Sequence, residues 1–150
     1  MAQAIPHSEA SRIAKFMGLR GWPRIDDVGL VALVETGLPI STAVTIARKL
    51  DPKGAYLEVH DLIPKATYYR RKKLKQPLTK DQSEMIYALS KVFSEAIRHY
   101  HDDKESASLF LSRKHPLLGG RSPLDVARES TAGADLVMDL FARAEAGVAI

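Results

Sequence analysis

Six basic side chains lie close together in the middle of the chain, where they could bind the phosphates of a nucleic acid. They are Lys65, Arg70, Arg71, Lys72, Lys73 and Lys75, and no acidic residue lies among them. The whole chain carries 22 Lys and Arg against 18 Asp and Glu, so without these six residues it would be slightly acidic. The local excess indicates a polyanion-binding segment, whereas the net acidic stretch 122–150 is expected to have another partner.

The basic segment follows a predicted short helix around residues 56–62 and the dipeptide Ile63-Pro64, an order that fits a helix-turn-helix. Such a helix can enter the major groove of DNA, where cations and hydroxyls meet phosphates and a few side chains reach base edges. We expect Tyr68 to face the core and Tyr69 to be exposed. The alternative is a solvated basic face. The predicted DNA-binding residues are Lys65, Thr67, Tyr69, Arg70, Arg71, Lys72 and Lys73.

A second segment, residues 115–124, has the composition of a shaped loop between two helices. Gly119 and Gly120 allow backbone angles that other residues resist, Ser122 can cap a following helix, and Pro123 suits its first turn. Such a loop indicates a recognition surface. The alternative is an ordinary connection between helices.

No pattern in the chain indicates catalysis or a metal site. The five histidines have no ligand spacing, and the two in His99-x-His101 would point to different sides of a helix. The sequence contains no Ser, His and acid combination typical of a nucleophilic enzyme, no glycine-rich phosphate-binding loop and no helical HExxH motif. We therefore expect no enzyme activity, no cofactor and no metal.

The elements that must position these residues are predicted to be helices throughout, because apolar residues recur at steps of three and four. We expect residues 1–10 to be mobile. The clearest helix starts at Thr79, where Gln82 completes a capping box, and carries an apolar stripe to Tyr100. The other predicted helices begin at Ser11, at Asp26 or Asp27, at Ser41 or Thr42, near Tyr56, at Lys65, at Asp102 or Asp103, at Pro123, and after a Thr131 cap.

Composition favours a folded, all-α protein. Of the 150 residues 45% are apolar, enough for one compact unit or two small subdomains with a shared core. Cysteine is absent, which excludes disulfides and agrees with a reducing compartment. The expected location is the cytoplasm, with no membrane association, because no apolar run is long enough to cross a bilayer and the N-terminus does not resemble a signal peptide.

Several separated segments, in the same order, resemble antitoxins of RES-Xre toxin-antitoxin systems, which join an Xre-type helix-turn-helix to an Xre/MbcA/ParS toxin-binding domain. The resemblance covers most of the chain. Tyr68 stands where the family usually has an aliphatic residue. The matching segments are Gly37-Leu38-Pro39, residues 63–71, 78–84, 107–111 and 116–124, Gly133-Ala134 with Val137, and residues 140–148.

The resemblance implies a non-enzymatic antitoxin that covers the active-site entrance of a RES-domain toxin, an enzyme that degrades NAD. It also implies autoregulation through binding to the promoter DNA of its own operon, by an antitoxin that pairs as a homodimer. From the residues themselves, the apolar end after Gly147 could insert into a partner's cleft. The predicted toxin-binding residues are Leu118, Gly119, Gly120, Arg121, Arg143, Glu145, Gly147, Val148 and Ile150.

The predicted organisation has three parts: a flexible N-terminal region with a short helix at 1–22, an Xre-like helix-turn-helix domain at 23–78, and a long helix with the toxin-binding domain at 79–150. Two other functions remain open. One is a stand-alone repressor without a toxin partner, and the other is an interaction protein whose helix-turn-helix no longer binds DNA.

Overall fold

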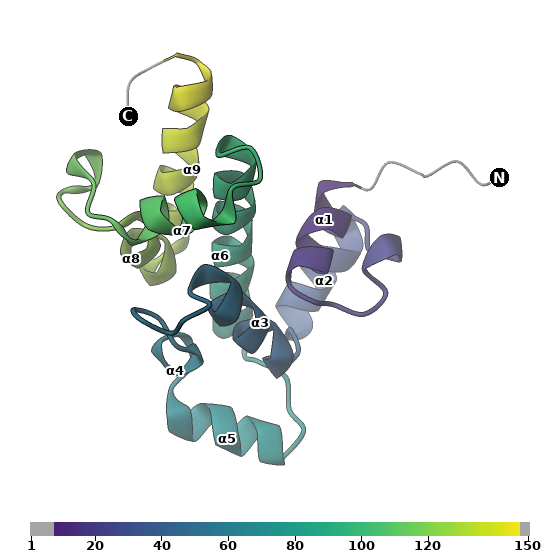
Figure 1. Cartoon of the computed structure of the whole chain (residues 1–150). Coiled ribbons are helices and arrows are strands. Elements are labelled where there is room, and N and C mark those ends of the chain that lie inside the picture. Colours follow the sequence, from purple (N-terminus) through teal and green to yellow (C-terminus); the bar gives the residue numbers. More distant parts are fainter. Residues whose placement is uncertain (1–7, 148–150) are drawn as a thin grey trace.

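The computed structural model describes residues 8–147, and these residues form helices and connecting loops without a strand (Figure 1). This confirms the predicted all-α fold class. The α-helices are α1 (Glu9–Phe16), α2 (Asp27–Thr36), α3 (Ile40–Leu50), α4 (Val59–Leu62), α5 (Lys65–Lys73), α6 (Lys80–His99), α7 (Lys104–Ser112), α8 (Pro123–Glu129) and α9 (Thr131–Glu145). Two short 3-10 helices, η1 (Trp22–Arg24) and η2 (Pro116–Leu118), lie in the connections.

Helix α6 is the central element of the fold. Its apolar residues recur at helical spacing, and those that pack inward are almost fully buried: Ile86, Leu89, Val92, Phe93 and Ala96. Helices α1, α2, α3, α7, α8 and α9 all contact it. In Figure 1, α1 and α2 lie on one side of α6, and α8 and α9 lie on the other. One continuous hydrophobic core therefore joins residues from all three predicted parts of the chain.

Local sequence signals account for several helix starts. The side chain of Thr79 accepts a hydrogen bond from the backbone N–H of Gln82 at 3.1 Å, and the Gln82 side chain accepts one from Thr79 N–H at 3.0 Å. This confirms the capping box at the start of α6. Asp26, Asp103 and Ser122 cap α2, α7 and α8 as N-cap residues. These caps satisfy amides that have no partner within the helix.

The structure corrects four predicted boundaries. Helix α1 begins at Glu9, with Ser8 as its N-cap, and Ala10 is buried. The expected mobility of residues 1–10 is therefore wrong for residues 8–10. Helix α3 begins at Ile40, directly after Pro39. Helix α4 begins only at Val59, because the residues from 51 to 57 form a loop. Ser130, and not Thr131, caps α9.

Helices α8 and α9 meet at a tight joint. Ser130 ends α8 and also caps α9, accepting a hydrogen bond from Gly133 N–H at 2.9 Å. Gly133 has ordinary helical backbone angles, yet a Cβ atom at this position would overlap the carbonyl oxygen of Val126 in α8. The lack of a side chain at Gly133 therefore lets α9 approach the backbone of α8.

Gly133→Ala should destabilise the protein. At an open helix position this change would add about 1 kcal/mol of stability through helix propensity. Here the overlap with the Val126 carbonyl should reverse the sign and cost about 1–3 kcal/mol, as for other overpacked sites. Urea unfolding of the purified protein measures the difference. Ala132→Gly, at the exposed neighbouring position, is the control and should lose only about 0.5–1 kcal/mol. A Gly133→Ala protein at least as stable as the parent would contradict the close approach.

Candidate functional site

Helix α5 carries the basic cluster on an exposed surface. It follows α4 through Ile63 and Pro64, and in Figure 1 it lies at the end of the molecule opposite to the tip of α9. Tyr68 is the single buried residue of α5, and its ring packs edge-to-face against His60 of α4, with 5.3 Å between the ring centres. Tyr69 is 52% exposed. The predicted orientations of Tyr68 and Tyr69 are thus confirmed.

The predicted DNA-binding residues divide into two groups. Those whose side chains are exposed along α5 are Lys65, Tyr69, Arg70, Lys72 and Lys73. Thr67 and Arg71 are only partly exposed. The exposed group offers four cations and a phenolic hydroxyl on a helix with no acidic residue, which suits contact with phosphate oxygens.

Arg71 has a structural partner that the sequence did not reveal. Its Nη1 atom donates a hydrogen bond to the carbonyl oxygen of Pro77 at 2.7 Å, and its Nε atom is buried without a partner among the described residues. The bond ties α5 to the segment that leads into α6. Arg71 therefore holds α5 in place within this structure, and Arg70, next to it, is the freer of the two cations.

The loop before α4 is organised by Asp51, a buried carboxylate. One of its oxygens accepts hydrogen bonds from the backbone N–H groups of Tyr56 at 2.6 Å and Leu57 at 2.9 Å. Burial by itself would raise the pKa of Asp51, but hydrogen bonds from these amides and from those of Lys53 and Ala55 outweigh it, so the pKa is lowered. The ionised form of Asp51 therefore stabilises the loop that orients α4 and α5.

The loop predicted as a recognition surface is closed by its own backbone. His115 N–H donates to the carbonyl of Arg121 at 3.0 Å, and Gly120 N–H donates back to the carbonyl of His115 at 3.1 Å. Gly119 and Gly120 both have positive φ, at 66° and 78°, so the predicted need for glycine is confirmed at these two positions. The loop projects to one side of α7 and α8 in Figure 1.

Leu118 requires a correction. It was predicted to contact a partner, but it is only 6% exposed and belongs to the core, whereas Leu117 is 51% exposed. The 3-10 turn of η2 decides which of the two leucines faces inward. Leu117 is therefore the apolar side chain that the loop presents to solvent.

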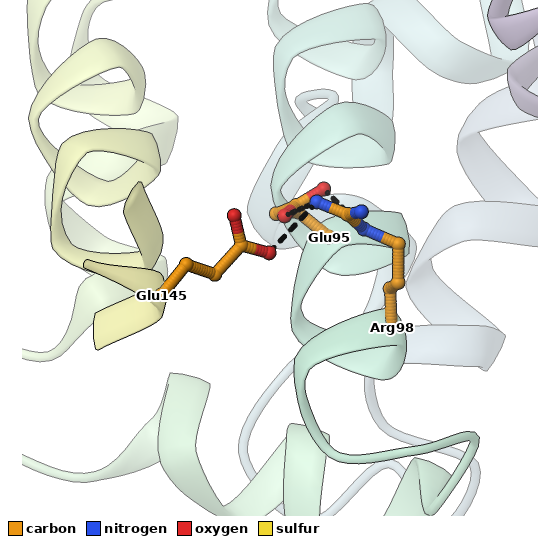
Figure 2. A network of polar contacts seen from close by, with 3 residues as sticks. All are labelled: Glu95, Arg98 and Glu145. Atoms are coloured by element: carbon orange, nitrogen blue, oxygen red, sulfur yellow. Dashed lines mark hydrogen bonds and ion pairs between the residues drawn. The ribbon is translucent and has the colours of Figure 1, made fainter. Parts of the chain in front are cut away.

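Arg121 and Glu145 have ion-pair partners in the free chain. Arg121 pairs with Glu129 of α8, with 2.5 Å between Nη2 and Oε1. Figure 2 shows that Glu145, near the end of α9, points toward Arg98 of α6, which also contacts Glu95. The Nη2 atom of Arg98 lies 2.5 Å from Glu95 and 3.0 Å from Glu145. The Arg98–Glu145 and Arg121–Glu129 pairs are exposed on both sides, so each contributes little to stability and can exchange partners at low cost.

The remaining predicted toxin-binding residues lie at or beyond the end of α9. Arg143 is exposed and forms no ion pair within residues 8–147. Gly147, with φ at 81°, is the last described residue. Val148 and Ile150 lie outside the described residues.

Comparison with known families identifies a domain in the C-terminal part of the chain. Residues 96–147 match the model of the antitoxin Xre/MbcA/ParS C-terminal toxin-binding domain. The match supports an Xre-type antitoxin, and a domain of this kind implies a toxin as partner. It includes the loop with Gly119 and Gly120 and the whole of α9, but not the basic helix α5. No curated protein matches the chain.

Candidate metal sites and candidate membrane spans are absent from the part of the chain that the structure describes, except for one bent pair of helices. No group of three or more His, Cys, Asp or Glu side chains could hold a metal ion. No single helix is long and apolar enough to cross a membrane, and α2 and α3 reach that length and apolarity only when taken together across a bend of 107°.

Replacing Asp51 should loosen the loop before α4. Asp51→Ala leaves the backbone amides of Tyr56 and Leu57, among others, without their acceptor, so we expect a loss of about 1–3 kcal/mol in unfolding free energy. Because its pKa is lowered in the folded state, the parent should lose this contribution as pH falls below about 4, and the variant should not. Thermal unfolding between pH 3 and 7 tests both effects. Asp135→Ala, an exposed change on α9, should leave stability within about 0.5 kcal/mol.

Proposed function

We propose that this chain is the antitoxin of a type II toxin-antitoxin system and that its toxin is a RES-domain enzyme that degrades NAD. The observation that carries the proposal is the match of residues 96–147 to a toxin-binding antitoxin domain. The resemblance of the loop at 116–124 and of the end of α9 to RES-Xre antitoxins supports the choice of toxin. The antitoxin performs no chemistry itself and acts in the cytoplasm by covering the active-site entrance of the toxin.

In this proposal the toxin contacts the loop around Gly119 and Gly120 and the end of α9. Leu117 supplies an exposed apolar contact, and Arg121 is an exposed cation of the same loop. At the other surface, Arg143 is free of ion pairs within the described chain, and Glu145 can leave the exposed Arg98 for a partner. The apolar residues Val148 and Ile150 follow directly in sequence and would enter the toxin's cleft.

Binding of promoter DNA is the second part of the proposal. It rests on the exposed cations of α5 and on the order of α4, turn and α5, which suits insertion of α5 into a major groove. A homodimer would present two such helices to a two-fold operator. The same chain would then both neutralise the toxin and regulate its own operon by binding the promoter.

Co-expression with the product of the adjacent gene tests the antitoxin assignment. We expect the partner alone to stop growth and deplete NAD, and the full chain to restore both and to co-purify with the partner. Removing residues 147–150, or Arg143→Ala, should reduce protection, whereas Arg24→Ala, an exposed arginine of η1, should not. Full protection by the shortened chain would refute the inserted C-terminus, and an absence of toxicity and of a complex would refute the antitoxin assignment.

Promoter binding should depend on α5 and on salt. For a protein that contacts several phosphates, the logarithm of affinity falls linearly with the logarithm of salt concentration. Arg70→Ala should weaken binding to the operon's own promoter fragment and reduce the salt slope by about 1, without changing stability. Arg71→Ala should in addition lower stability by about 1 kcal/mol, because the Pro77 carbonyl loses its donor.

Fluorescence anisotropy over a range of salt concentrations, with thermal unfolding of each variant, separates the two arginines. Arg24→Ala is again the matched control and should bind DNA like the parent. An Arg70→Ala variant with unchanged affinity and salt slope would exclude α5 as the DNA-binding helix, while leaving the toxin-binding assignment intact.

A further inference from the structure

A groove with a volume of about 860 Å³ lies between α1, α3, α6, α7 and the loop after α3. It is separate from α5 and from the loop at 115–121. Pockets that hold small molecules have about this size. The groove draws side chains from all three predicted parts of the chain, so it exists only in the assembled fold.

Aromatic and apolar side chains form the floor of the groove. Phe93 of α6 is buried, and Phe16 of α1 packs against it edge-to-face, with 5.3 Å between the ring centres. Tyr56 and Leu109 also line the groove and are 46% and 45% exposed. Such a floor can cover the face of a flat, apolar ring.

Cations surround this floor. They are Arg12, Arg48, Lys49, Lys53, Arg98 and Lys104. Arg98 is engaged with Glu95 and Glu145, but within residues 8–147 the other five form no ion pair. Of the three acidic residues that line the groove, Asp51 uses its carboxylate on backbone amides. Only Asp102 and Glu105, both exposed near the start of α7, remain.

Lys49 lies where these features meet. Its Nζ atom donates to the carbonyl of Phe16 at 2.6 Å and lies 4.3 Å from the centre of the Phe16 ring. Burial, followed by the positive charges of Lys104 and Lys15, lowers the pKa of Lys49. The cations at this wall therefore repel one another in the free protein, and a bound anion would relieve the repulsion.

We propose that this groove binds a nucleotide, with its phosphates toward Lys49 and Lys104 and its base against the exposed side chains of Tyr56 and Leu109. Phosphate groups suit unpaired cations, and an aromatic base suits an apolar floor of this kind. The proposal goes beyond toxin and DNA binding and does not depend on either.

Isothermal titration of the full-length chain with ATP, sodium tripolyphosphate and adenosine tests the proposal. We expect ATP to bind most tightly, because only ATP combines the phosphates with a base. Lys49→Gln and Lys104→Gln should each weaken ATP binding about tenfold or more, as for loss of a charge-assisted hydrogen bond. Lys72→Gln, which removes an exposed cation from α5, should leave ATP binding unchanged and serves as the matched control.

Amide NMR shifts on addition of ATP locate the site. Shifts centred on α3, α7 and the loop at 51–56 would support the groove. Shifts centred on α5, or equal losses for Lys72→Gln and Lys49→Gln, would mean that ATP binds the basic helix as a general polyanion and would overturn the proposal. Equal affinities for tripolyphosphate and ATP would overturn the role of the aromatic floor, and no binding of ATP would overturn the site as a whole.

Discussion

Burial of the apolar stripe of α6 is the constraint on which the rest of the structure depends. At 20 residues α6 is longer than any other described helix, and residues such as Ile86, Leu89 and Phe93 are almost fully buried. Fully burying one side chain of this kind contributes about 1.5–3 kcal/mol relative to exposure. Six other helices supply the surface that covers this stripe. The positions of the C-terminal surface and of the groove follow from how these helices pack on α6.

Polar contacts fix the start of α6 against the N-terminal helices. The backbone N–H of Leu38 donates to the buried hydroxyl of Ser83 at 2.9 Å, and Leu78 N–H donates to the carbonyl of Leu38 at 2.9 Å. Both bonds cross between the connection of α2 to α3 and the entry to α6. Because Arg71 also holds the carbonyl of Pro77, the entry to α6 is linked on one side to the core and on the other to α5.

The three candidate surfaces differ in how their charges are compensated. On α5 the exposed cations have no acid within the helix. At the C-terminal end, Arg98 and Arg121 already hold carboxylates in exposed pairs. In the groove, five cations form no ion pair within residues 8–147, and the buried carboxylate that lines it, Asp51, accepts hydrogen bonds from backbone amides. The groove combines unpaired cations with an apolar floor, whereas α5 presents cations alone. The two surfaces therefore suit different ligands.

The sequence alone was sufficient for the features that depend on neighbours along the chain. Helical spacing of apolar residues predicted an all-α fold and the extent of α6, and side chains able to accept from nearby amides predicted the caps at Thr79 and Ser122 and narrowed the cap of α7 to Asp102 or Asp103. Tyr68 and Tyr69 were assigned correctly, because adjacent residues on a helix lie about 100° apart and one of them had to face the core. The positive φ angles of Gly119 and Gly120 are likewise a feature that depends only on neighbouring residues in the chain.

Tertiary packing decided everything that depends on which segments meet. No spacing in the sequence indicates that Arg71 reaches Pro77, that Leu118 rather than Leu117 is buried, or that Lys49 and Lys104 line one groove with Phe16. These outcomes depend on contacts between helices that are far apart along the chain, and the apolar surface each helix must bury sets them. Local sequence patterns thus predict where the helices lie along the chain. Which charged or apolar side chains remain exposed for a partner is decided only by the packing of the other helices on α6.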